Sequence, residues 1–291
     1  MINIEKGYSF RRQFSTREQK ATIMKEIVDL IDDAIFIGGT AYIAHMLDVI
    51  KDPKKLRYQK DIDFFTKDRD KAIKILEARG YSKRSEPIIE GVEVTDKYAK
   101  YDTQRRKIVG KIKLKIPEEK KDGTLVYEIP VGVGVDIISK NYYSQSFPDP
   151  EKAVKSLIRN AKKTDAFGFE MSVQDIEDFV VMKLLNMERA FKGEEKVIYN
   201  RDVYDVLNLI YALGDDLDFS YISDLIGGRD ILREKLEKAR RKVVEPKSEI
   251  DETLVKLITV QEIRNLDANP VFLIDDKKKE IDMLDYVLEN I

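Results

Sequence analysis

The feature that most constrains this chain is an apolar run that ends in Gly38, Gly39 and Thr40, followed by a second apolar run that carries Asp61 and Asp63. The first run is typical of a strand, and the small residues after it form a turn that opens a helical pattern. Alternate side chains of a strand share a face, so the two aspartates of the second run point the same way. A strand, turn, helix and strand are therefore expected here.

The residue types in these two runs indicate a particular chemistry. Two carboxylates on one face of a strand repel each other unless a cation lies between them. A glycine-rich turn at the start of a helix offers backbone N–H groups, a hydroxyl and a positive helix end to an anion. A phosphate site beside a divalent-metal site favours phosphoryl or nucleotidyl transfer.

Composition excludes several other classes of site. The chain of 291 residues has a formal charge of −2, no cysteine and a single histidine, His45. Disulfides, thiolate metal sites and multi-histidine zinc sites are therefore excluded, and any nucleic-acid contact must depend on local patches. We find no apolar signal segment at the N-terminus and no run long enough to span a membrane, so we expect a soluble, cytoplasmic protein.

The first part of the chain mixes helices and strands. A capping box at 15–18 begins the first helix, and residues 1–14 are interpreted as a short polar-aromatic lead-in. The segment 88–139 is rich in β-branched residues, with a turn signal at Asp122-Gly123. The patterns predict helices at 17–32, 41–50 and 69–79, and strands at 34–37, 61–66, 92–98, 108–116, 125–129 and 131–138.

The second part is nearly all helical, which predicts an α+β fold with a mixed, helix-flanked sheet followed by an all-α region. We place a domain boundary near residue 172, giving a catalytic domain at 1–172 and a helical domain at 173–291 that completes the cleft. The predicted elements are a helix at 151–162, a strand at 167–171, and helices at 173–192, 200–213, 220–226, 229–242, 250–264 and 279–290.

A third aspartate adds to the first two. The run 131–138 is typical of a buried strand, yet it contains Asp136. The Gly38-Gly39-Thr40 turn, the Asp61-x-Asp63 pair and this later aspartate together resemble the nucleotidyltransferase superfamily of the DNA polymerase β type. The resemblance implies that Asp61, Asp63 and Asp136 hold two Mg²⁺ ions, or Mn²⁺, on a nucleoside triphosphate.

The helical part narrows the resemblance to the AbiEii/AbiGii toxin-type branch. Lys183, then Asp202 in an Arg-Asp pair, and Asp205 one turn later are similar to the branch's helical motifs, and Arg57 matches a position shortly before the Asp-x-Asp pair. The spacing before the aspartates is longer than usual in the branch, and Gln59 replaces a small hydroxyl residue. Both differences concern the path by which substrate enters.

The resemblance also implies roles. Asp61, Asp63, Asp136 and Lys183 would be catalytic. The triphosphate would bind at Gly38, Gly39, Thr40, Arg57 and Lys183, while Asp202 would orient the lysine or an acceptor. An ordinary salt bridge remains as good an interpretation of Asp205, and a packed or solvated side chain is the better interpretation of His45.

Three functions are compatible with the sequence. The first is an enzyme that transfers NMP from an NTP, such as ATP or GTP, to a hydroxyl of tRNA or another nucleic acid, with an antitoxin protein as partner. The second is a nucleotidyltransferase that acts on a small molecule, as antibiotic-modifying relatives do. The third is a non-catalytic nucleotide-binding or toxin–antitoxin interaction protein, against which the three aspartates argue.

Overall fold

The computed structural model describes residues 8–13, 17–50, 61–83, 104–107, 118–119, 125–130, 133–140, 142–143, 147–190, 196–198, 200–213, 216–244, 285 and 288. The chain forms two compact units, each made of several chain segments. Unit 1 consists of Met1–Asp32, Lys60–Ile62 and Asp68–Ile137, and unit 2 of Asp33–Gln59, Asp63–Lys67 and Ile138–Ile291. The domain boundary near residue 172 stays a prediction.

Unit 1 contains two helices and a set of antiparallel strands. Tyr81, just after the second helix, donates a hydrogen bond of 2.9 Å to Glu26 on the first helix. The second helix is capped by Asp68, whose carboxylate accepts from the backbone N–H of Lys71, and is followed by Gly80 at φ +85°. The elements are α1 (Arg17–Leu30), α3 (Arg69–Ala78), β4 (Ser82–Lys83), β5 (Gln104–Lys107) and β8 (Val133–Ile138), with the strands neighbours in that order.

A separate three-stranded sheet also belongs to unit 1. Strand β1 (Tyr8–Gln13) pairs in parallel with β7 (Leu125–Pro130), which pairs antiparallel with β6 (Glu118–Glu119). The strand β1 lies within the segment interpreted as a polar-aromatic lead-in, where the sequence patterns predicted no strand. Its register with a segment more than a hundred residues away is a long-range pairing that local sequence does not reveal.

Unit 2 is organised around a mixed sheet. Strand β3 (Ile62–Phe65), of which Ile62 is assigned to unit 1 and the other residues to unit 2, pairs antiparallel with β2 (Ile35–Phe36). Strand β2 in turn pairs in parallel with β10 (Phe169–Val173), and β10 pairs antiparallel with β9 (Lys162–Ala166). The predicted α+β class with a mixed, helix-flanked sheet is confirmed.

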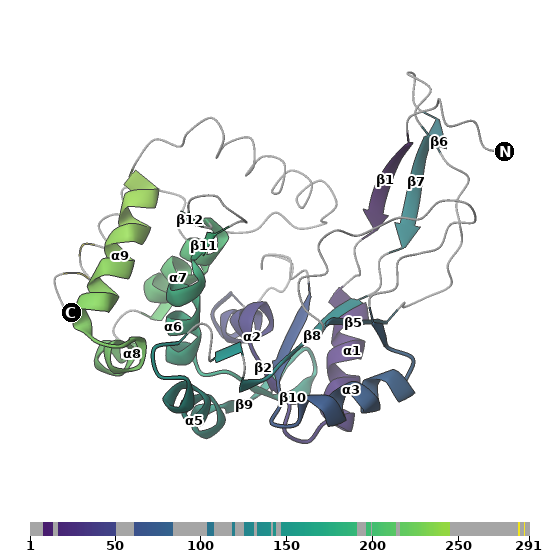
Figure 1. Cartoon of the computed structure of the whole chain (residues 1–291), viewed down its shortest axis with the longest axis horizontal. Coiled ribbons are helices and arrows are strands. Elements are labelled where there is room, and N and C mark those ends of the chain that lie inside the picture. Colours follow the sequence, from purple (N-terminus) through teal and green to yellow (C-terminus); the bar gives the residue numbers. More distant parts are fainter. Residues whose placement is uncertain are drawn as a thin grey trace. The chain divides into compact units, whose positions relative to one another are not determined.

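The helices of unit 2 surround α6 (Figure 1). Helix α6 contacts the helices α2, α5, α7, α8 and α9. Nine of its residues, from Ile176 to Leu184, are buried, as expected of a helix that is apolar on nearly every side. The bounds are α2 (Gly38–Ile50), α5 (Pro150–Asn160), α6 (Ile176–Asn186), α7 (Asn200–Leu213), α8 (Phe219–Ile226) and α9 (Arg229–Val244).

Two elements differ from their predicted form. The strand predicted at 167–171 is a hairpin of β9 and β10, because Phe167 and Gly168 at its centre both have positive φ and form the turn. The helix predicted at 173–192 begins only at Ile176 and ends at Asn186, where a short hairpin of β11 (Glu188–Ala190) and β12 (Lys196–Ile198) follows. The predictions at 92–98, 108–116 and 250–264 lie outside the described residues, and of the predicted helix at 279–290 only Asp285 and Leu288 are described, both as helical.

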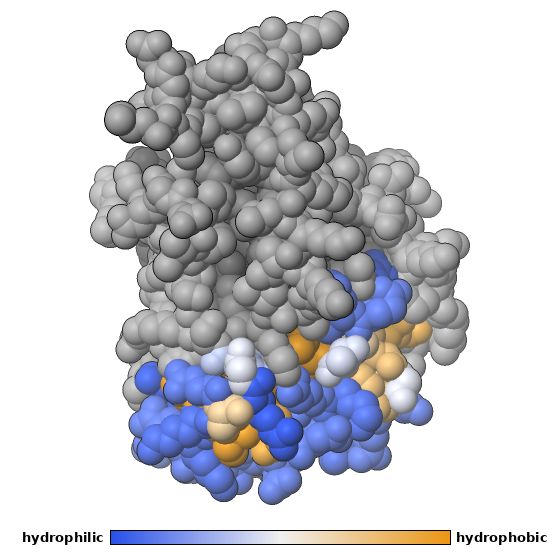
Figure 2. All heavy atoms as spheres, turned by 90° about the vertical axis from the view of Figure 1, so that its right-hand side faces the viewer, coloured by the Kyte–Doolittle hydropathy of each residue, from blue (hydrophilic) through white to orange (hydrophobic). Residues whose placement is uncertain are grey.

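The described surface is mainly polar. Val49 is the large hydrophobic side chain that stands out as exposed among the described residues. On the face drawn in Figure 2, most of the coloured residues are hydrophilic, with small apolar groups between them. Within the described part of the chain, no helix combines the length and the apolar character that crossing a membrane requires.

Candidate active site

In unit 2 the glycine turn lies directly against a carboxylate. Helix α2 begins at Gly38, which has φ +59°, and a Cβ added there would lie 3.0 Å from Asp63 Oδ2. The backbone N–H of Ile37 donates to the carbonyl oxygen of Asp63 at 3.0 Å. A side chain at residue 38 would thus meet both an unfavourable backbone conformation and the carboxylate. The N-terminus of α2 and Asp63 form one polar surface.

The residues that follow Gly38 differ in accessibility. Gly39 is half-buried, so its backbone is partly open, whereas Thr40 is completely buried. Both belong to the first turn of α2, which starts three residues earlier than predicted. The free N–H groups of a first helical turn are the donors that an anion would use, so the backbone carries more of this binding capacity than the threonine hydroxyl does.

In unit 1 a second carboxylate lies against strand β8. Any side chain at Gly134 would collide with the carboxylate of Asp61, and an added Cβ would lie 3.1 Å from its Cγ. Val133, Val135 and Ile137 are completely buried on one face of β8.

Asp136 alternates with those buried residues and shares the other face of β8 with Gly134. Asp136 lies opposite Gln104 of β5 in the strand register. The carboxylate of Asp61 therefore lies against the face of β8 that carries Asp136. This face of β8 is therefore lined by carboxylates, and Gly134 leaves the space that the Asp61 side chain occupies.

Lys20, a residue that the sequence interpretation missed, also belongs to unit 1. It is only 3% exposed, and burial lowers its pKa to about 7, although the charge of Asp61 acts to raise it. Lys20 precedes Ile23, Met24 and Ile27 on α1 at helical spacing, which places a lysine within the apolar stripe. That position was the signal available in the sequence. Lys20 and Lys183 are the two lysines that are buried among the described residues.

Lys183 is the centre of a buried ionic cluster in unit 2. Its ammonium nitrogen lies 2.6 Å from Asp202 Oδ1 and 2.9 Å from Asp205 Oδ2. The three side chains are 8%, 1% and 2% exposed, so little water screens their charges. Helix α6 supplies the lysine, and α7 supplies both aspartates from successive turns of one face. Lys183 is therefore buried and paired, and Asp205 forms a salt bridge with it.

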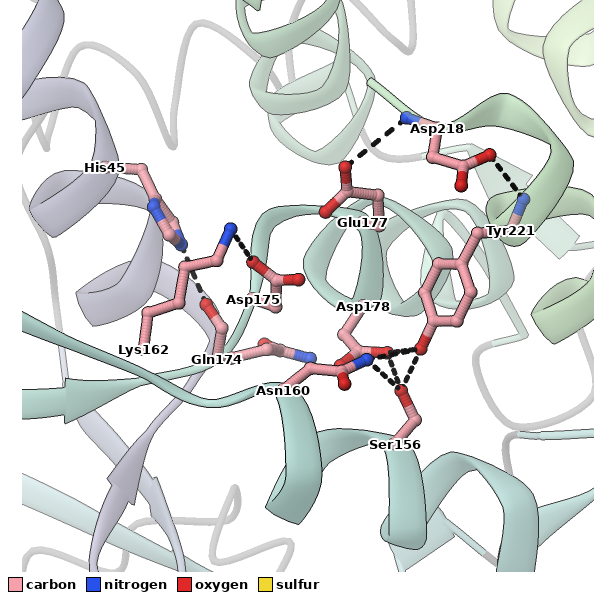
Figure 3. A network of polar contacts seen from close by, with 10 residues as sticks. All are labelled: His45, Ser156, Asn160, Lys162, Gln174, Asp175, Glu177, Asp178, Asp218 and Tyr221. Atoms are coloured by element: carbon pink, nitrogen blue, oxygen red, sulfur yellow. Dashed lines mark hydrogen bonds and ion pairs between the residues drawn. The ribbon is translucent and has the colours of Figure 1, made fainter. Parts of the chain in front are cut away.

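The first turn of α6 carries a second group of buried charges (Figure 3). Asp178 accepts hydrogen bonds from Ser156 at 2.5 Å and from Tyr221 at 3.2 Å, and these two hydroxyls also contact each other. Burial raises the pKa of Asp178 to about 6, against the opposing effect of the two hydrogen bonds. Asp175, three residues earlier, pairs with Lys162 at 2.7 Å.

The sequence interpretation had treated this region only as a helix start. Glu177, between the two aspartates, accepts from the backbone N–H of Asp218, and burial raises its pKa as well. Three acids within four residues were the visible signal. A cavity of about 540 Å³ opens beside the group, lined by residues of α5 and α8. Its lysines Lys152 and Lys155 pair with Asp224 and Glu151, so we assign it no ligand.

The structure leaves some predicted site residues apart or outside its description. Arg57 lies outside the described residues. His45 is half-buried, and its Nε2 lies 2.7 Å from the carbonyl oxygen of Gln174. Among the described residues, no group of three or more histidine and acidic side chains is gathered closely enough to hold a metal ion.

Two solved structures match this chain, both with low sequence identity and low TM-scores. The crystal structure of JHP933 from Helicobacter pylori has 15% sequence identity and a TM-score of 0.40, over 96% of this chain and 93% of that chain. An antigenic nucleotidyltransferase-like protein from Paracoccidioides brasiliensis has 16% identity and a TM-score of 0.38, over 68% of this chain and 78% of that chain. No curated protein sequence matches.

A family model gives the clearest comparison. The model described as nucleotidyl transferase AbiEii toxin, type IV toxin–antitoxin system, matches residues 22–214, which is more than half of the chain. The match includes the glycine turn, Asp61 and Asp63, Asp136, and the Lys183 cluster. It confirms the resemblance inferred from those motifs. The chain therefore belongs to the AbiEii nucleotidyl transferase toxin family.

Proposed function

We propose that the protein is a Mg²⁺-dependent nucleotidyltransferase that moves NMP from an NTP to an acceptor hydroxyl and releases pyrophosphate. The observation that carries the proposal is the contact of the Gly38 turn with Asp63, because it joins a phosphate-binding helix end to a carboxylate that attracts a metal. Membership of a nucleotidyl transferase family supports the nucleotide as substrate.

The donor set suits Mg²⁺. Mg²⁺ prefers oxygen ligands and is usually held by one or two carboxylates together with substrate phosphates and water. A closed group of three protein ligands is therefore not required, and its absence among the described residues does not conflict with the proposal. Asp61, Asp63 and Asp136 are the residues that would hold Mg²⁺, or Mn²⁺, when a triphosphate is bound.

Each proposed residue has a chemical task. Mg²⁺ held by these aspartates would neutralise charge on the triphosphate and would lower the pKa of the acceptor hydroxyl. Backbone N–H groups at Gly38 and Gly39 bind phosphate oxygens, and Lys183 places a positive charge toward them. The acceptor oxygen bonds to the α-phosphorus, the bond from the α-phosphorus to the β-phosphate oxygen breaks, and pyrophosphate leaves. Asp136 takes the hydroxyl proton.

The proposed acceptor is tRNA or another nucleic acid. The proposed protein partner is an antitoxin, which the toxin–antitoxin character of the family supports.

Incubation of the protein with Mg²⁺, each α-labelled NTP in turn, and total tRNA or cell extract tests the proposal. We expect labelled acceptor with the wild-type chain and at least a hundredfold less with Asp63→Asn, because a metal ligand is lost. Asp165→Asn is the matched control, since Asp165 is an exposed residue of β9 and its loss leaves the transfer unchanged.

Three other outcomes overturn parts of the proposal. If label joins a small molecule of the extract and no nucleic acid, the proposed nucleic-acid acceptor is wrong and the protein modifies a small molecule. Equal transfer by wild type and Asp63→Asn removes Asp63 from the mechanism. Absence of transfer to any acceptor, combined with NTP binding that needs no metal, replaces the enzyme with a nucleotide-binding module.

A further inference from the structure

We propose that Tyr42 is a positioning residue that sets the place of Lys183 relative to the glycine turn, by way of Phe179. The inference rests on the proposed function, in which the turn and the lysine bind one triphosphate. Tyr42 is four residues after Gly38 on α2, one helical turn into the helix that begins at the phosphate-binding end.

The first step is the contact between two helices. The rings of Tyr42 on α2 and Phe179 on α6 have centroids 6.0 Å apart and planes inclined by 31°. Both side chains are buried, at 3% and 0% exposure, so the contact is inside the core. Aromatic pairs at this separation have a preferred geometry, so the tyrosine ring constrains where the phenylalanine ring lies.

The second step joins the phenylalanine to the lysine. Phe179 and Lys183 are four residues apart on α6 and therefore neighbours on one face of the helix. The ammonium nitrogen lies 5.4 Å from the centroid of the phenylalanine ring, within the range of a cation–π contact. The ring that Tyr42 packs against is thus the ring over which the ammonium is placed.

The third step ties the same tyrosine to α7. The side-chain amide of Asn208 donates to the hydroxyl oxygen of Tyr42 at 3.3 Å. Asn208 is three residues after Asp205, which pairs with Lys183, so the tyrosine also contacts the helix that provides the lysine's carboxylate partners. The ring of Tyr42 therefore contacts α6 and its hydroxyl contacts α7, which are the two helices that supply the ionic cluster.

The ring and the hydroxyl make separate contributions. Tyr42→Leu removes the ring that packs against Phe179, whereas Tyr42→Phe keeps the ring and removes the hydroxyl that accepts from Asn208. A residue that merely fills the core would affect folding stability alone. A positioning residue would also affect the affinity for the phosphate groups that the lysine contacts.

The experiment measures the affinity of full-length variants for each of the four NTPs and the matching NMPs, with Mg²⁺, by titration calorimetry. We expect Tyr42→Leu to weaken NTP binding about tenfold and Tyr42→Phe no more than about threefold, in line with the loss of an aromatic contact and of one neutral hydrogen bond. NMP affinity stays unchanged, because an NMP lacks the phosphates that Lys183 contacts.

Tyr221→Leu is the matched control, since it removes a tyrosine of the same unit that contacts Ser156 and Asp178 and not Lys183. Its NTP affinity stays at the wild-type value. Equal losses in Tyr42→Leu and Tyr221→Leu, or equal losses for NTP and NMP, overturn the inference while the proposed function stands. Absence of NTP binding by the wild-type chain overturns both.

A double-mutant cycle gives an independent test. In a Lys183→Met/Asp205→Asn background, which removes one positive and one negative charge, Tyr42→Leu has no further effect on NTP affinity if it acts through the lysine. Additive effects contradict the inference. If this background does not fold, the cycle is run with Lys183→Arg, where the effect of Tyr42→Leu falls below its wild-type value.

Discussion

Buried charged side chains at the two ends of helix α6 have different kinds of partners. Toward its C-terminal end, Lys183 is paired with Asp202 and Asp205, so opposite charges compensate one another. In its first turn, Asp178 is surrounded by the hydroxyls of Ser156 and Tyr221, which stabilise its charge only through dipoles. The paired carboxylates compensate the charge of Lys183, whereas burial raises the pKa of the Asp178 carboxyl to about 6 although the two hydroxyls act to lower it.

This difference matches the tasks proposed for the two regions. A group that binds a triphosphate needs to be held in a constant place, and the two buried carboxylates hold the ammonium of Lys183. The start of α6 has no proposed chemistry, and its acids hold α5, α6 and α8 together through short polar contacts (Figure 3). Buried charge alone therefore does not identify a functional site in this protein.

The largest effect is expected for Lys183→Met. Loss of the ammonium leaves Asp202 and Asp205 buried beside each other, which lowers the free energy of unfolding by about 3–5 kcal/mol. Urea denaturation followed by circular dichroism measures the change. A loss under about 1 kcal/mol shows that water reaches the cluster and that the contrast between the two ends is wrong.

An intermediate effect is expected for Asp178→Asn. Burial raises the pKa of Asp178 from 3.8 to about 6, so the native state binds the proton more tightly than the unfolded chain does. The stability from this carboxyl is full below pH 3.8 and is lost as the pH rises through about 6. The asparagine variant lacks this loss, and we expect it to be more stable at pH 7 by up to about 2 kcal/mol.

Urea midpoints of wild type and Asp178→Asn between pH 4 and 8 check this prediction. The wild-type curve declines over the lower half of the range, and the variant's curve is flatter. The exposed Asp165→Asn serves as control and keeps the wild-type slope. A variant that is less stable than wild type at pH 7 shows instead that the hydrogen bonds from Ser156 and Tyr221 outweigh the cost of burying the charged carboxylate.

The smallest effect is expected for Lys162→Met. Lys162 pairs with Asp175 at 2.7 Å, but its side chain is 62% exposed. Water screens the pair and replaces the lysine when it is lost, so the unfolding free energy changes by less than about 1 kcal/mol. Parallel denaturation of Lys162→Met and Lys183→Met compares an exposed pair at the start of α6 with a buried pair toward its end, and equal losses refute the role of burial.

Local signals explain which elements the sequence predicted well. The capping box before Arg17 predicted α1, and Gly80 marked the end of α3. Helix α7 matches its predicted bounds, 200–213. In each case the apolar period and the end signals are properties of a short segment, which is what sequence patterns report.

Long-range and hidden features explain the rest. The parallel pairing of β1 with β7 depends on residues far apart in the chain, and the β9–β10 hairpin depends on a Phe167 in the left-handed region, which its residue type does not suggest. Lys20 was missed because a lysine on an apolar stripe is usually interpreted as solvated. The positioning role proposed for Tyr42 depends on how α2, α6 and α7 pack together, which the sequence pattern of a single helix does not show.

The central claim is transfer of a nucleotide, and the position of the transferred phosphorus tests it most directly. Wild-type protein is incubated with Mg²⁺ and total tRNA or cell extract, once with α-labelled and once with γ-labelled NTP. We predict that label from the α-position joins the acceptor and that γ-label leaves as pyrophosphate. Transfer of γ-label to an acceptor would show a phosphoryl transferase and contradict the account.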